Sequence, residues 1–188
     1  MKNILNLIVI LLTNSIFSQT IIPIEQRKNN VELDGQTYYY KDVNGVFNKF
    51  LGNWKYQDNP TNPTKIVEIT FYKREMVQSG MGGFYDEIYA RIKYTENGVI
   101  IYNTFPENQP VLNKRDHNIL GGYFTNPLNT NNLDLSYYSE PGLGGKTGTL
   151  ELMYENVMGV EKLNWKVKTF RDPNNPFRMP YNMELIKQ

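Results

Sequence analysis

The most regular feature of this chain is a strict alternation of apolar and polar positions. Within residues 64–74, Val67, Ile69 and Phe71 fall on one face, and polar or tyrosine side chains fall on the other. Residues 84–95 repeat the pattern. Because successive side chains of a strand point to opposite sides, both segments are predicted to be half-buried β-strands.

Turn-rich segments separate a whole series of such strands. The tightest turn is Glu96-Asn97-Gly98, where Asn-Gly accepts the positive φ angles of a hairpin. The pattern predicts nine strands, at residues 53–58, 64–74, 84–95, 99–104, 119–125, 133–139, 147–155, 162–170 and 181–187. Many short strands with regular turn signals favour an antiparallel sandwich or barrel. Composition does not shift along residues 41–188, so we expect them to form a single domain.

One segment follows a helical period instead. Its apolar positions recur at helical spacing and gather on one face; they are Val43, Val46, Phe47, Phe50 and Leu51. Gly52 is a suitable residue to end a helix. We therefore expect a short helix over residues 41–51 that leans its apolar face on the sheet. The preceding arm, residues 19–40, has a weaker pattern, and its Tyr38-Tyr39-Tyr40 triplet fits an edge strand or a mobile arm.

Residues 1–18 have the layout of a secretory signal peptide. Lys2 gives a positive start, residues 4–12 are almost entirely apolar, and Ser18 precedes the expected cleavage at Gln19. A bilayer-spanning helix needs roughly 20 apolar residues, and the polar residues that follow the apolar run interrupt it too early. We expect secretion to the periplasm or the extracellular space, with no transmembrane segment in the mature chain.

Composition excludes several classes of site and partner. The 188 residues include 14 Tyr, 9 Phe and 2 Trp, which suits a β fold. The absence of cysteine rules out disulfides, iron–sulfur clusters and thiolate metal sites. Removing residues 1–18 takes Lys2 from the 20 basic residues, so 19 remain to balance 19 acidic ones. Nucleic-acid binding normally needs a basic excess, so we expect no nucleic-acid partner.

The segment FLGNWKY, residues 50–56, resembles the start of a calycin-type barrel, the group that includes the lipocalins. The likeness rests on Gly52, Asn53 and Trp54, a Gly-x-Trp motif that opens the first strand after the short helical pattern. The resemblance implies that Trp54 closes the base of the barrel and that Arg171, directly after strand 162–170, covers it. The leader, this segment and the ending MPYNMELIKQ also resemble small secreted families of unknown function from Bacteroidota, especially the Flavobacterium group.

The expected fold is therefore mainly β. It is an antiparallel calycin- or lipocalin-like barrel of about 8–10 strands, with one short N-terminal helix at residues 41–51. A ninth strand, residues 181–187, and the long connection at residues 105–118 leave an open barrel, a ten-stranded barrel or a β-sandwich as alternatives.

An up-and-down strand order would divide the connections between two ends. Residues 78–83, 105–118, 140–146 and 171–180 would lie at the end of the helix, and residues 57–64, 96–98, 126–132 and 156–161 would surround an open mouth. Alternation places six candidate ligand-binding residues inside the barrel: Tyr56, Phe71, Ile92, Tyr137, Leu152 and Trp165. They would contact a small, mostly apolar molecule. An eight-stranded barrel is also narrow enough for such side chains to fill it.

The candidate catalytic side chains lack the partner residues that known catalytic mechanisms require. His117 is the only histidine, and although Asp116 precedes it, no serine stands out as a nucleophile. Asp86 and Glu87 are adjacent on a strand and point to opposite faces, so they cannot act as a paired acid and base. We expect no enzymatic activity.

Ligand-loop patterns are equally incomplete. The glycine-rich segments 80–83 and 142–145 lack a following helix or Gly-Lys-Ser/Thr and suit hairpin connections. Asp172, Asn174 and Asn175 match no calcium loop and suit a proline-bounded turn. We expect no metal and no cofactor.

The tyrosines carry a second functional hypothesis. Tyr85 and Tyr89 share the polar face of strand 84–95 with Arg91. Exposed tyrosines suit glycan stacking or protein contact, although tyrosine is also simply a good strand residue. The alternative to a ligand-binding barrel is therefore an envelope or extracellular interaction module. Its barrel would be packed, and it would use this face or the arm at residues 19–40 to contact an unknown partner.

Overall fold

The computed structural model describes residues 20–27, 38–80, 82–105, 119–137, 148–169 and 178–188. Over these residues the chain forms eleven strands and one short 3-10 turn. In chain order they are β1 (Thr20–Pro23), η1 (Ile24–Gln26), β2 (Tyr38–Lys41), β3 (Gly52–Gln57), β4 (Lys65–Gln78), β5 (Phe84–Glu96), β6 (Val99–Asn103), β7 (Ile119–Tyr123), β8 (Asn132–Tyr137), β9 (Gly148–Val157), β10 (Val160–Thr169) and β11 (Asn182–Lys187).

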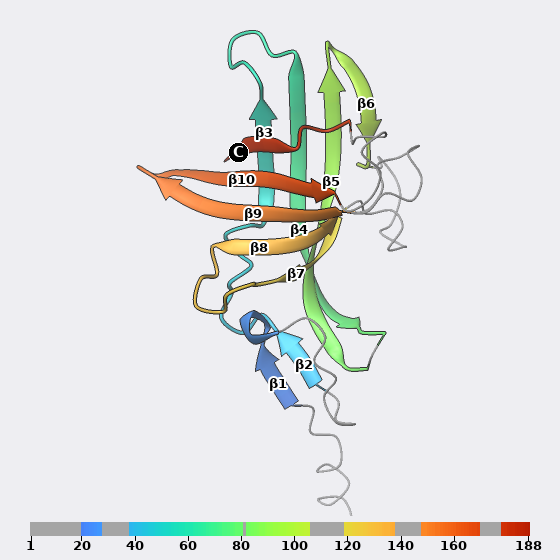
Figure 1. Ribbon diagram of the computed structural model, residues 1–188, viewed down its shortest axis with the longest axis vertical. Helices are drawn as coiled ribbons and strands as arrows, with labels where there is room; N and C mark the ends of the chain where they lie inside the picture. The colour runs from blue at the N-terminus through green and yellow to red at the C-terminus, as the bar shows by residue number, and fades with distance from the viewer. Residues whose placement is uncertain (1–19, 28–37, 81, 106–118, 138–147, 170–177) are drawn as a thin grey trace, which may run out of the picture.

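Eight of the strands close into an antiparallel barrel, in the order β3-β4-β5-β7-β8-β9-β10-β11. β11 returns to β3, with Lys187 opposite Trp54, and β5 pairs with β7 to complete the ring. In Figure 1 the wall of β3, β4 and β5 runs crosswise to the wall of β8, β9 and β10. The predicted mainly-β antiparallel barrel is confirmed, and the sandwich, open and ten-stranded alternatives are wrong.

The edge of β5 that faces β7 is shared by three strands. β2 pairs with its start, at Phe84 and Tyr85; β7 pairs with Ile88 to Ala90; and β6 pairs with its end, at Lys93 to Glu96. The predicted strand at 99–104 therefore exists as β6, but it lies outside the ring. The predicted ninth strand, observed as β11, is the one that closes the barrel.

Because β6 is not part of the ring, each connection after it lies at the opposite end of the barrel from the end that the predicted strand order gives it. The connection from β7 to β8 lies beside residues 42–51, where the Lys49 ammonium donates hydrogen bonds to Thr130 Oγ1 (3.1 Å) and Asn131 Oδ1 (2.6 Å). We call this end the base. The assignment of residues 126–132 and 156–161 to the opposite mouth is therefore wrong. Residues 105–118, 140–146 and 171–180 fall largely outside the described part of the chain.

The predicted helix at residues 41–51 is also wrong. Residues 42–51 form successive turns with three-residue spacing, including Asn48 N to Gly45 O (3.1 Å) and Phe50 N to Phe47 O (2.9 Å). Gly45 takes a φ of +63°, which breaks a right-handed helix. The two phenylalanines of the predicted apolar face still pack inward and are fully buried, whereas Val43 is 50% exposed.

The described parts of the N-terminal arm belong to the same sheet. β1 and β2 run parallel to each other, and β2 runs parallel to the start of β5. Tyr38, Tyr39 and Tyr40 are therefore strand residues that lie between β1 and β5. In Figure 1 this extension projects below the barrel.

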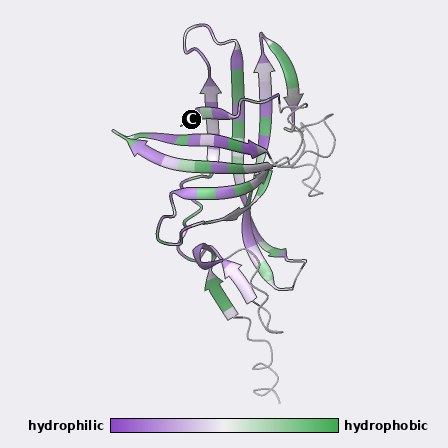
Figure 2. Ribbon diagram, in the orientation of Figure 1, coloured by the Kyte–Doolittle hydropathy of each residue, from purple (hydrophilic) through white to green (hydrophobic). Residues whose placement is uncertain are grey.

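Inward side chains of all eight barrel strands form one hydrophobic core. Figure 2 shows the alternation of apolar and polar positions along the strands. The largest fully buried side chains are aromatic: Trp54, Trp165, Tyr94, Tyr137, Phe47, Phe50 and Phe71. Burial of these rings supplies much of the hydrophobic stabilisation of a chain that has no disulfide.

Candidate functional site

The six interior candidates all belong to the core. Phe71, Ile92, Tyr137, Leu152 and Trp165 are buried, and Tyr56 is half-buried against the same cluster. The rings of Tyr137 and Trp165 meet edge to face at 5.9 Å. The indole N–H of Trp165 is buried without a hydrogen-bond acceptor among the described residues. The structure thus brings these six side chains together in a packed interior, where the Trp165 N–H has no acceptor within the described part of the chain.

The Gly-x-Trp segment forms the base of the barrel. Trp54 is 1% exposed, and its indole N–H donates to Phe50 O at 2.8 Å. The Lys187 ammonium lies 5.3 Å from the centre of the Trp54 ring. Arg171 lies outside the described residues. The cation observed over Trp54 is therefore Lys187 of β11. β11 closes the barrel, whereas the sequence pattern predicted it only as an additional ninth strand.

Asp86 and Glu87 point to opposite faces of β5, yet both are fully buried. Asp86 accepts hydrogen bonds from the Tyr39 hydroxyl (2.6 Å) and from Asp42 N (2.8 Å). Burial, together with the hydrogen bond to Asp86, raises the pKa of Tyr39. This inner group fastens β2 and the following turns to β5, which is a structural role.

Glu87 organises the outer face of β4 and β5. Its carboxylate accepts a hydrogen bond from Arg74 Nε at 3.0 Å and a second from Arg74 Nη2. The Arg27 guanidinium also interacts electrostatically with Glu87. One buried carboxylate therefore binds Arg74 and attracts Arg27 beside the neighbouring tyrosines.

The tyrosines of this outer face are stacked. Tyr72 and Tyr89 stack at 5.1 Å with 16° between their planes. The Arg74 guanidinium lies 5.8 Å from the Tyr89 ring, and the Arg27 guanidinium lies 3.9 Å above the Tyr85 ring. Tyr40 is opposite Tyr85 in the register of β2 and β5. We name this surface the tyrosine face; it consists of Tyr40, Tyr72, Tyr85, Tyr89, Arg27, Arg74 and Glu87.

The sequence placed Tyr85 and Tyr89 on one face but did not reveal the rest of this surface. Tyr72 and Arg74 come from β4, and Arg27 follows η1. Alternation within β4 assigned Tyr72 to an outward face, but only the pairing of Tyr72 with Tyr89 places the two rings in contact. Arg91 lies on the same side and donates instead to Thr104 O at 3.4 Å.

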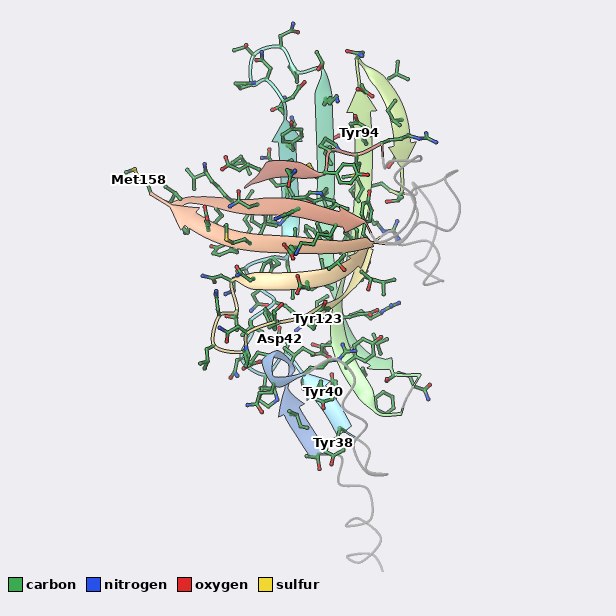
Figure 3. The ribbon with its side chains drawn as sticks, viewed as in Figure 1. Tyr38, Tyr40, Asp42, Tyr94, Tyr123 and Met158 are labelled. Atoms are coloured by element: carbon green, nitrogen blue, oxygen red, sulfur yellow. The ribbon has the colours of Figure 1, made fainter. Side chains whose placement is uncertain are left out.

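A cavity of about 490 Å³ adjoins the tyrosine face at the base. It is lined by Glu25, Gln26, Arg27, Tyr123, Phe124, Thr125 and Pro127, and we name it the base pocket. In Figure 3, Tyr123 on β7 lies above Tyr40 and Tyr38 on β2. Arg27 contributes to both the tyrosine face and the base pocket, so the two surfaces are continuous.

A comparison with family models matches residues 1–188, the whole chain, to one family. The chain belongs to the family of unknown function DUF6705. No curated protein and no solved structure matches it.

The glycine-rich segment at 80–83 has a packing role at its last residue. A Cβ on Gly83 would lie 2.6 Å from Tyr38 O, so glycine allows β2 to approach β5 closely. The similar segment at 142–145 and the candidates His117, Asp172, Asn174 and Asn175 lie outside the described residues. Within the described ranges, no group of three His, Asp or Glu side chains could hold a metal ion. No helix in that part of the chain has the length and apolar character needed to span a membrane.

Proposed function

We propose that the protein is a secreted interaction module that binds a protein partner through its tyrosine face, with the filled barrel as a rigid scaffold. The observation that carries the proposal is the stacked arrangement of Tyr72 on Tyr89 and of Arg27 on Tyr85. Secretion rests on the signal-peptide pattern of residues 1–18.

Tyrosine and arginine are the side chains that most often dominate binding energy at protein interfaces. They offer a large contact area, and each retains a polar group for hydrogen bonds. Stacking already restricts the rings and guanidiniums here, so binding would cost little further side-chain entropy. Tyr72 is 36% exposed, which leaves it accessible to a partner.

The interior supports a scaffold role. Seven large aromatic side chains of the core are fully buried, and the six interior candidates belong to the same cluster or pack against it. A closed barrel of eight strands has little room beyond its side chains. The outward surface is therefore the more favourable place for recognition.

Site-specific photocrosslinking tests this function. The mature chain carrying p-benzoylphenylalanine at position 72 is expected to crosslink a discrete protein in the secreted fraction of its source cells. A matched chain with the same group at position 153 is the control, because Met153 is 40% exposed on the outer face of β9. Tyr89→Ser should abolish the crosslink from position 72. Equal crosslinking from both positions, or none from position 72, would refute the proposal.

One observation favours a second candidate, a small molecule inside the barrel. The buried Trp165 N–H has no acceptor among the described residues, and such a donor is costly to leave unmatched. A mostly apolar molecule with one acceptor would satisfy it. Native mass spectrometry of protein from its own source should then show a co-purifying mass that Trp165→Phe reduces; an unliganded mass would contradict this candidate.

A further inference from the structure

A groove of about 500 Å³ lies on the outer face of β8, β9 and β10, beside the β7–β8 connection. In Figure 1 this wall of the barrel runs crosswise to the wall of β3, β4 and β5. Strand register arranges the floor of the groove in two rows that are about 7 Å apart along the strands. We name this surface the outer groove; its rows are Asn132, Met153 and Asn164, and Asp134, Glu151 and Lys166.

The β7–β8 connection forms one side of the outer groove and adds two amide side chains to it. Asn126 Oδ1 accepts a hydrogen bond from Leu128 N at 2.9 Å, and Asn129 Oδ1 accepts one from Asn131 N at 3.3 Å. These bonds hold both amide oxygens to the turn, while Asn126 and Asn129 remain exposed. The amide NH2 is therefore the group that each residue presents to a ligand.

The second row of the floor places two carboxylates directly opposite each other. Asp134 and Glu151 are partners in the register of β8 and β9, and like charges at such positions destabilise a sheet. The Thr125 hydroxyl donates to Asp134 Oδ2 at 2.5 Å, and the Lys168 ammonium pairs with Glu151. Burial, together with the nearby Glu151 charge, still raises the pKa of Asp134. The Glu151 side chain is 37% exposed, so a ligand that donates hydrogen bonds to both carboxylates would offset their repulsion.

Charge and hydrogen-bonding capacity restrict the class of ligand. The two carboxylates are balanced by two ammonium groups, since Lys166 is opposite Glu151 and Lys168 pairs with it, so the site favours neither a cation nor an anion. An apolar molecule would desolvate these groups without replacing their hydrogen bonds. An added peptide strand would need a free strand edge, whereas β8, β9 and β10 are each paired on both sides. Several hydroxyl groups on a neutral molecule fit best, because each hydroxyl can donate to a carboxylate and accept from an amide or ammonium.

We propose that the outer groove binds a neutral saccharide. Asp134 and Glu151 accept hydrogen bonds from neighbouring hydroxyls, and Asn164 and Lys166 donate to sugar oxygens. Met153, which is 40% exposed in the middle of the first row, packs against the C–H face of the sugar ring. The volume lies in the range of small-molecule sites. This inference goes beyond the proposed function, because it gives the protein a second ligand on a different wall of the barrel.

An NMR titration of the isotope-labelled mature chain with defined disaccharides tests the outer groove. The probes are maltose, cellobiose and N,N′-diacetylchitobiose, which are all neutral and differ in linkage and substituents. At least one should shift the backbone amide signals of residues 125–134, 151–153 and 164–166 in a saturable way and leave those of β4 unchanged. No saturable shift with any of the three, or shifts that include β4 equally, would show that the inference is wrong.

Charged sugars test the argument from charge balance. Glucuronic acid and glucosamine each add one charge to a ring of the same size as glucose. Both should bind more weakly than glucose, because the acid meets the carboxylate pair and the amine meets Lys166. Tighter binding of either charged sugar than of glucose would overturn the assignment to a neutral ligand.

One variant separates a binding role of the carboxylate pair from a structural one. Asp134→Asn should weaken binding of the sugar by about tenfold, because hydrogen bonds to a charged acceptor are roughly twice as strong as neutral ones. The same variant removes the repulsion from Glu151, so its urea midpoint should not fall. Ser136→Ala is the matched control, since Ser136 is exposed on the same face of β8 but does not line the groove. Unchanged affinity in Asp134→Asn, a lower urea midpoint, or an equal loss of affinity in Ser136→Ala would overturn the assignment.

The outer groove and the tyrosine face can be tested independently. Asp134→Asn should leave the crosslink from position 72 unchanged, because Tyr72 lies on β4. The ligand of the groove is a saccharide, so position 153 still serves as the control for crosslinks to a protein. A failed titration with a positive crosslink would reject the groove alone, and a saturable titration without a crosslink would reject the tyrosine face alone.

Discussion

Trp54 gives the most direct test of how the barrel is closed. It is 1% exposed, its N–H donates to Phe50 O at 2.8 Å, and Lys187 lies over its ring. Trp54→Ala removes the ring from a packed base, which typically costs about 3–5 kcal/mol. Domains of this kind have only about 5–15 kcal/mol of stability, so the variant should lose a large fraction of it.

The expected change in melting temperature follows from chain length. At about 2–4 °C per kcal/mol for a chain of this size, Trp54→Ala should lower the Tm by roughly 6–20 °C. Trp54→Phe retains most of the ring but leaves Phe50 O without its donor, which should cost about 1–3 kcal/mol. Far-UV circular dichroism during heating and urea titration measures both variants.

A matched control excludes a general effect of substitution. Met158 is fully exposed in the β9–β10 turn, so Met158→Ala should leave the free energy of unfolding nearly unchanged. If the Trp54→Ala variant had the same Tm as the wild-type protein, the placement of Trp54 as the buried side chain that closes the base would be refuted.

Three further predictions concern the sheet extension and the tyrosine face. Burial raises the pKa of Asp42 above its ordinary value. The stabilisation from its protonated form is therefore complete below about pH 4, the ordinary pKa of Asp, and is lost as pH rises through the folded-state pKa. Asp42→Asn should flatten the dependence of the urea midpoint on pH above about pH 4, and an unchanged slope would contradict this. Gly83→Ala should lower the Tm because the new Cβ would meet the Tyr38 carbonyl oxygen. Gly82→Ala is the control: Gly82 also has a positive φ but its Cβ would have no atom within 4 Å, so the Tm should fall less. Equal losses of Tm would contradict the close approach of β2 to β5. Arg74→Met should destabilise the fold by about 3–5 kcal/mol because it leaves the buried Glu87 carboxylate without its ion-pair partner. The double variant Arg74→Met/Glu87→Met should recover part of this loss in urea titrations. A double variant no more stable than Arg74→Met would contradict the pairing.

The tyrosine face and the base pocket differ in how much of each could be predicted from the sequence. The sequence places Tyr85 and Tyr89 on one face because they are four residues apart, an even spacing, on one strand. The base pocket could not be predicted, since Glu25 and Arg27 meet Tyr123 and Pro127 only after β1, β2 and β7 come together at the edge of β5. No local pattern encodes a contact between segments about one hundred residues apart.

The sequence by itself determined which residues face inward. Alternation in residues 64–74 and 84–95 is a local property of the backbone, and the burial of Val67, Ile69 and Phe71 follows from it. Only the tertiary structure decided how the strands pair. Alternation is the same whether residues 99–103 or 119–123 occupy the next place beside β5, so non-local hydrogen bonds made that choice. That choice left β6 outside the ring, brought β11 back to β3 and placed Lys187 over Trp54.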